Sequence, residues 1–142
     1  MTEELLKKVP PSSIEAETAL LGSILVSELA FPLAFKIVNK PDMFYVERHK
    51  IIYRAMCELY ENSMPVDSVT LVEHLKKKNL LEKAGGVLYI SELENKVPAS
   101  LNIEEYAKIV HEKYLLRTLI NETTKIIEKA YCLLYTSPSP RD

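Results

Sequence analysis

Apolar residues recur every three or four positions along most of the chain, a spacing typical of amphipathic helices. The first such helix is predicted from Ser12 to about Ser27. Ser12 and Glu15 have the spacing of a capping box, in which each side chain bonds a free backbone N–H of the other residue. The apolar residues that recur at roughly helical spacing within it are Ile14, Leu20, Leu21, Ile24 and Leu25.

Two further helices and a turn follow from the same pattern. A second helix is predicted over residues 30–38, with Pro32 in its first turn, where proline is tolerated. Residues 39–44 are predicted to form a turn. A third helix is predicted over residues 46–63, because its apolar residues fall on one face.

The next part of the chain predicts two shorter helices. The fourth lies within residues 64–79 and begins at a cap formed by Asp67 or Ser68. The glycine pair at 85–86 then interrupts the pattern, and a fifth helix is predicted over residues 87–97.

The longest predicted helix runs from Ile103 to Tyr131, because neither proline nor glycine interrupts these residues. Asn102, with Glu105 three positions later, marks its N-terminus. At 1.5 Å per residue the helix is about 43 Å long. Its apolar stripe consists of Ile109, Leu116, Leu119, Ile120, Ile126, Ile127 and Ala130, and Tyr106, Val110 and Tyr114 widen it near the start.

The predicted fold class is all-α, because no stretch alternates between apolar and polar residues as a half-buried strand does. Residues 11–101 are predicted to form a compact multi-helix head, followed by one long helix over residues 102–131. A head of about 90 residues has a radius of gyration of about 12 Å, so part of the long helix is predicted to project beyond it. Burying a large aliphatic side chain is worth about 1.5–3 kcal/mol, so the projecting stripe is expected to be covered by a second antiparallel helix or by another subunit.

Composition fits one modest domain with a real core, since 47% of the 142 residues are hydrophobic and 27% are charged. The net charge of −2 lacks the basic excess of a self-sufficient nucleic-acid binder. The two cysteines, Cys57 and Cys132, allow no disulfide framework, so a cytoplasmic location is predicted. The N-terminus has no signal-peptide core, and no apolar run reaches the roughly 18 residues that span a bilayer, so no membrane partner is predicted.

The sequence contains no nucleotide-binding, zinc-protease or other catalytic motif. No catalytic, cofactor-binding or metal-binding residue is therefore predicted. His49, His74 and His111 are scattered, and each is interpreted as an exposed or half-buried helix residue. Glu15 and Glu17 are interpreted through the helix dipole, which favours acidic side chains near an N-terminus.

Three stretches carry a family resemblance. They are PPSSIEAETALLGSIL from residue 10, MPVDSVTLVEHLKKKNLLEKAGGVLYISEL from residue 64 and VPASLNIEEYAKIVHEKYLLRTLI from residue 97. Phe44 and the run His49–Ile52 add to them. In this order the chain resembles, over about residues 10–131, the N-terminal domain of bacterial replicative DNA helicases of the DnaB family.

The resemblance implies an all-α head followed by a helical hairpin, of which residues 102–131 would be the first arm. It also implies that hairpins of neighbouring subunits pair, so that the domains form a collar, as a trimer of dimers, on a hexameric ring. In the family, primase docks on this collar, and in some members a helicase loader binds the linker region. Periodicity and family geometry together predict a subunit interface at Leu116, Leu119, Ile120, Ile126 and Ile127.

Members of this family also carry a RecA-like motor that hydrolyses ATP with Mg²⁺ and moves along single-stranded DNA. No residue of this sequence matches that motor, so no ATP, Mg²⁺ or DNA ligand is carried over to it. The parent protein is expected to be an ATP-dependent DNA helicase. The 142-residue chain is expected to have no enzymatic activity of its own.

The two ends of the chain depart from the helical pattern. Residues 1–10 are predicted to be a flexible N-terminal arm. Residues 132–142, CLLYTSPSPRD, match the translation of a transposase-type sequencing adapter. They are therefore interpreted as non-native, with the native sequence continuing differently after Tyr131.

The resemblance thus implies a collar and assembly domain of a replicative helicase, which is expected to support hexamer formation and primase docking during DNA replication. Two alternatives stay open: a stand-alone interaction module that joins a helicase ring in trans, and a small DNA-binding regulator that uses residues 66–83. A native stop codon directly after residue 131 would favour the first. Salt-dependent duplex binding would favour the second.

Overall fold

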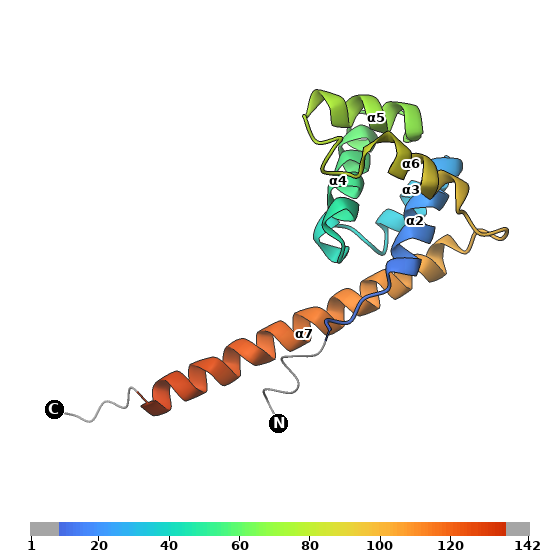
Figure 1. The fold of residues 1–142 in the computed structure, drawn as a ribbon. Coiled ribbons are helices and arrows are strands. Elements are labelled where there is room, and N and C mark those ends of the chain that lie inside the picture. Colours follow the sequence, from blue (N-terminus) through green and yellow to red (C-terminus); the bar gives the residue numbers. More distant parts are fainter. Residues whose placement is uncertain (1–8, 136–142) are drawn as a thin grey trace. The chain divides into compact units, whose positions relative to one another are not determined.

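Helices joined by short turns make up the fold of residues 9–135, which are the residues that the computed structural model describes (Figure 1). The described residues form two compact units. One comprises Ser12–Tyr114, and the other comprises residues 9–11 with residues 115–135. The predicted all-α class is confirmed.

Helix α2 spans Ile14–Val26 and is capped by Ser13 rather than by the predicted Ser12. The backbone of Ser13 is extended, and its Oγ accepts a hydrogen bond from the Ala16 N–H at 3.2 Å. The predicted Ser12–Glu15 capping box is therefore wrong, since the residue three positions after the true cap is Ala16. A serine pair before a helix leaves the capping position ambiguous by one residue.

Helix α3, Ala30–Phe35, ends three residues earlier than predicted. Val38 lies outside the helix and is fully buried, and its carbonyl oxygen accepts a hydrogen bond from the Tyr53 hydroxyl at 2.6 Å. The Val38 N–H still donates to the Ala34 carbonyl at 2.7 Å. The predicted turn over residues 39–44 contains a short 3₁₀ helix, η1 (Pro41–Met43), and helix α4 follows over Glu47–Glu61.

Helices α5 (Ser68–Lys77) and α6 (Gly86–Asn95) complete the Ser12–Tyr114 unit together with the start of α7. Of the two predicted caps for α5, Asp67 is the one used. Its Oδ1 accepts from the Thr70 N–H at 2.9 Å, and the Thr70 hydroxyl oxygen accepts from the Asp67 N–H at 3.1 Å. Gly85 has a backbone φ of +103°, which residues with a side chain rarely adopt. A glycine at this position therefore permits the turn into α6.

The core of this unit lies where α2 packs against α3, α4 and α6, while α5 packs against α4 and α6. Gly22 permits a close approach of α2 and α6, because a Cβ at that position would lie 2.3 Å from the carbonyl oxygen of Leu93. The largest fully buried apolar side chains of the core are Tyr53, Phe44, Leu20, Leu21, Ile24, Ile52, Met56, Leu71, Leu75 and Ile90. Ile103, Ala107 and Val110, from the start of α7, are buried in the same core.

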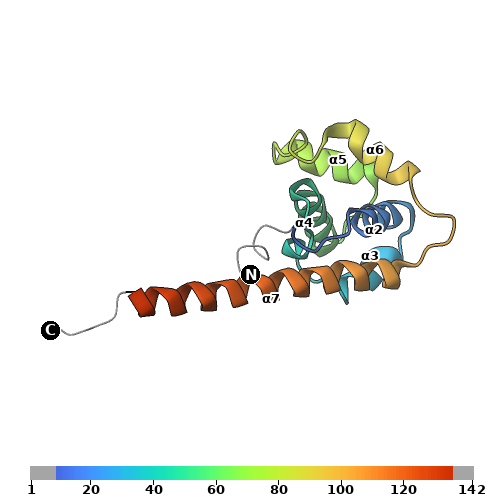
Figure 2. The ribbon, with the colours of Figure 1, turned by 60° about the horizontal axis from the view of Figure 1, so that its bottom comes forward.

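Helix α7 runs unbroken from Ile103 to Tyr135, four residues beyond its predicted end, as Figure 2 shows. Its 33 residues make it about 50 Å long. Leu133 and Leu134 favour helix, so local propensity accounts for the added turn. The prediction of a flexible arm falls largely on residues outside the described range. Of that arm the structure describes Val9 and Pro10, which are exposed.

Candidate functional site

The C-terminal part of α7 carries the predicted interface residues, and no residue of the stretch 115–135 is buried. Leu119 is 63% exposed and Ile126 is 67% exposed. Leu116 and Ile120 are exposed to a smaller extent, and Ile127 is half-buried. Helical geometry places these five side chains on one face, and we call this face the α7 stripe.

The opposite face of the same stretch is polar. Thr118 and Asn121 are exposed there, and the Lys125 ammonium lies 3.1 Å from a carboxylate oxygen of Glu122. The separation of an apolar stripe from a polar face is the pattern of a helix that packs on one side only. An exposed apolar stripe of this kind is a candidate surface for contact with other protein.

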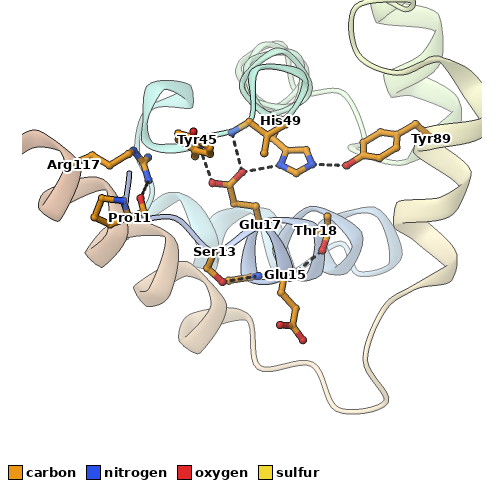
Figure 3. A network of polar contacts seen from close by, with 11 residues as sticks. Pro11, Ser13, Glu15, Glu17, Thr18, Tyr45, His49, Tyr89 and Arg117 are labelled. Atoms are coloured by element: carbon orange, nitrogen blue, oxygen red, sulfur yellow. Dashed lines mark hydrogen bonds and ion pairs between the residues drawn. The ribbon is translucent and has the colours of Figure 1, made fainter. Parts of the chain in front are cut away.

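Arg117 fixes the segment that precedes α2 to this part of α7. Its Nη1 donates a hydrogen bond to the carbonyl oxygen of Pro11 at 2.8 Å, over a separation of 106 residues (Figure 3). A guanidinium donating to a backbone carbonyl is a charge-assisted hydrogen bond, which is stronger than a neutral one. The bond leaves the α7 stripe uncovered, because four of its five side chains are still exposed and the fifth is half-buried.

A second polar feature lies inside the Ser12–Tyr114 unit, where the Glu17 side chain is almost fully buried (Figure 3). Its two carboxylate oxygens accept hydrogen bonds from the backbone N–H groups of Tyr45 at 2.7 Å and Val46 at 3.3 Å. His49 Nδ1 lies 2.7 Å from Glu17 Oε1, and His49 Nε2 lies 2.5 Å from the Tyr89 hydroxyl. The chain Glu17–His49–Tyr89 therefore links α2, α4 and α6.

A carboxylate, an imidazole and a hydroxyl in line resemble the parts of a nucleophilic triad, but the tyrosine does not suit that task. Burial raises the pKa of the Tyr89 hydroxyl, although the nearby Arg48 lowers it. The Arg48 guanidinium lies 4.6 Å from the centre of the Tyr89 ring. The hydroxyl therefore stays protonated at neutral pH and serves as a structural link rather than as an activated nucleophile.

This network overturns one interpretation made from the sequence and adds to another. His49 is fully buried rather than exposed or half-buried. Glu17 lies in the first turn of α2, in keeping with the helix-dipole interpretation, and is also a buried acceptor. The apolar spacing contained a signal for both. Glu17 stands four residues before Leu21 and His49 four before Tyr53, which places each on the buried face of its helix.

The remaining candidate side chains lie apart from one another. His74 and His111 are half-buried, as predicted, and His74 Nε2 lies 2.7 Å from Glu58 Oε1. Cys57 is half-buried, and burial raises the pKa of its thiol to about 12, so the reactive thiolate is scarce at neutral pH.

Within residues 9–135 no group of three or more His, Cys, Asp or Glu side chains is placed to hold a metal ion. None of the helices in the described range combines the length and the apolar character that crossing a bilayer requires.

The fold and these surfaces define an all-helical domain with a buried polar link and an uncovered apolar stripe on its long last helix. A family model described as the DnaB-like helicase N terminal domain matches residues 9–112. The chain belongs to this family, and the resemblance found in the sequence is confirmed.

Relatives of known function are similar over nearly the whole chain. Replicative DNA helicase DnaC of Bacillus subtilis (strain 168) is 44% identical over 131 residues, which are 92% of this chain and 29% of that protein. Replicative DNA helicase DnaB of Geobacillus stearothermophilus is 41% identical, with the same shares covered. The chain thus spans less than a third of the length of these relatives.

Solved structures agree with the fold. The crystal structure of the N-terminal domain of DnaB helicase from Mycobacterium tuberculosis has a TM-score of 0.83 and 35% identity, covering 87% of this chain and 88% of that one. A structure described as that of a DnaB-like replicative helicase and its interactions with primase has a TM-score of 0.73 and 27% identity. The matched region covers 84% of this chain and 28% of the chain of that helicase.

Proposed function

We propose that this chain is the N-terminal collar domain of a replicative DNA helicase and that it joins subunits through the α7 stripe. In the proposed assembly, copies of the domain pair along α7 and form a trimer of dimers on a hexameric ring. The observation that carries this proposal is the exposure of Leu116, Leu119 and Ile120, with Ile126 and Ile127, on one face of a long helix.

The energy available from this stripe supports pairing. Burying a Leu or Ile side chain completely is worth about 1.5–3 kcal/mol, and the stripe has five of them. Partial burial of the same residues on two copies still supplies several kcal/mol, before the cost of association is subtracted. The polar face, with Thr118 and Asn121, would stay in water.

Primase is the proposed partner of the assembled collar, and the solved relative described together with primase supports this. A helicase loader is a further proposed partner. ATP, Mg²⁺ and single-stranded DNA would bind the motor of the parent protein, which we propose to be a cytoplasmic ATP-dependent helicase. This chain would contribute assembly and docking to that activity.

A chimeric helicase tests the proposal. The segment of the Bacillus subtilis helicase that aligns with this chain is replaced by residues 1–131, and the product is studied by native mass spectrometry. We expect hexamers that bind B. subtilis primase in biolayer interferometry. Because the stripe carries the contact, the double variant Leu119→Asp/Ile126→Asp is expected to shift the population to smaller species.

The matched control is the double variant Thr118→Asp/Asn121→Asp, which adds the same charge to the exposed polar face of the same helix. This control is expected to remain hexameric. Hexamers that persist in the stripe variant at low micromolar concentration would refute the proposed interface. Hexamers of the parent chimera that fail to bind primase would refute the docking role alone.

A further inference from the structure

A cavity of about 550 Å³ lies in the Ser12–Tyr114 unit, and none of its lining residues belongs to α7. The buried Ile24 and Phe31 line it together with the exposed Tyr60 and Met64, and Ser27, Glu28 and Ser63 add polar groups. The Phe31 and Tyr60 rings pack with their centres 4.8 Å apart. The cavity is open to solvent, and sites of this size that combine apolar walls with a few polar groups are where proteins hold small ligands.

The side of the cavity formed by residues 63–66 is held in place by hydrogen bonds. Ser63 takes φ +57° after the end of α4, and the Met64 N–H donates to the Leu59 carbonyl at 2.9 Å. The Thr70 hydroxyl donates to the Pro65 carbonyl at 2.8 Å. These bonds order the rim before any partner arrives, which lowers the entropic cost of binding.

Two of the apolar side chains that line the cavity are exposed. Tyr60 and Met64 are each 48% exposed. An aromatic ring and a flexible thioether are side chains that protein interfaces favour. The rim therefore offers area that a partner side chain can cover.

The charged residue that lines the cavity is Glu28, and no Lys, Arg or His is among the lining residues. In the described part of the chain the Glu28 carboxylate takes part in no ion pair. A cationic group on the occupant would complement it.

We propose that this cavity binds a short segment of a partner protein in which a large apolar residue lies next to Lys or Arg. The apolar side chain rests on Phe31 beside Tyr60 and Met64, and the cation pairs with Glu28. This site does not involve the α7 stripe and does not depend on the collar function.

The test is an unbiased selection on the full chain. A phage library of random dodecapeptides is panned against the immobilised protein, and enriched sequences are synthesised with a fluorescent label for anisotropy titrations. We expect enriched peptides to share a Leu, Phe, Met or Trp within three positions of Lys or Arg. Raising the salt concentration is expected to weaken their binding.

Two variants locate the site. Met64→Glu places a charge at the apolar wall and is expected to weaken binding at least tenfold. Glu28→Lys reverses the charge of the carboxylate that lines the cavity, and panning against it is expected to enrich acidic peptides instead. Both positions are exposed, so both variants are expected to keep the parent circular dichroism spectrum.

Thr118→Asp/Asn121→Asp serves as the control, and the enriched peptides are expected to bind it as they bind the parent protein. Three results would overturn the proposal. They are no enrichment over the bare support, enriched peptides that bind Met64→Glu as well as the parent, and charge reversal at Glu28 that leaves the selected motif basic. If Met64→Glu instead abolishes self-association of the chain, the occupant is a second copy, and the proposal of a foreign segment is wrong.

Discussion

At the scale of single residues, Glu17 shows how this domain accommodates a buried charge. Removing a carboxylate from water costs several kcal/mol unless donors replace the lost hydration. Here the Tyr45 and Val46 N–H groups and the His49 ring do so. The two N–H groups belong to the turn before α4, so one acidic side chain of α2 fixes where that helix begins.

Replacing Glu17 by glutamine tests this role. Glu17→Gln removes the charge and presents an amide N–H₂ to groups that are themselves donors, so we expect a loss of about 3 kcal/mol in the free energy of unfolding. Urea denaturation followed by circular dichroism measures it. Glu15→Gln is the control, because Glu15 is exposed and should lose less than about 1 kcal/mol. Equal denaturation midpoints for the two variants would mean that the buried carboxylate contributes little.

The spacing of Glu17 and His49 could have shown that both are buried, but not that they meet. His49 lies 32 residues after Glu17, and Tyr89 lies 40 residues after His49. Helical periodicity reports which face of a helix is covered. It does not report which helix covers that face, so the network required the three-dimensional arrangement.

At the scale of elements, local signals predicted the helices well where caps and glycines mark the ends. The Asp67 cap and the Gly85 turn are local chemistry, and both were readable in the sequence. The end of α3 was not, because the Val38 carbonyl is bonded by Tyr53, which comes 15 residues later in the sequence. The end of α3 thus depends on tertiary contacts, and helix propensity alone does not predict it.

Gly22 gives an element-scale prediction in which two physical effects have opposite signs. Helix propensity alone predicts that Gly22→Ala stabilises α2 by about 1 kcal/mol. The added Cβ would lie 2.3 Å from the Leu93 carbonyl oxygen, so α2 and α6 would have to separate. We expect a net loss of about 2 kcal/mol, as for overpacked cores. Thermal unfolding of the parent and the variant shows whether the substitution stabilises or destabilises the domain. A rise in Tm would show that α6 moves away from α2 at little cost in free energy.

At the scale of the whole molecule, the sequence predicted that α7 is a long uninterrupted helix with an apolar stripe, although the helix ends four residues later than predicted. Both follow from one uninterrupted period of apolar residues, which needs no partner to be recognised. The identity of the covering partner does not follow from that period. A helix from another subunit and a second helix of the same chain would bury the same five residues.

Self-association of the isolated chain is the molecular-scale consequence of an uncovered stripe. We expect the weight-average mass from light scattering to rise between about 5 and 500 μM, since association through several exposed Leu and Ile side chains depends on concentration. Leu119→Asp/Ile126→Asp should abolish the rise, and Thr118→Asp/Asn121→Asp should preserve it. The comparison is repeated on residues 1–131, because Leu133 and Leu134 are also exposed and add apolar surface to α7. A strictly monomeric 1–131 chain at all concentrations would show that the stripe is stable in water. The proposed subunit contact would then lose its physical basis.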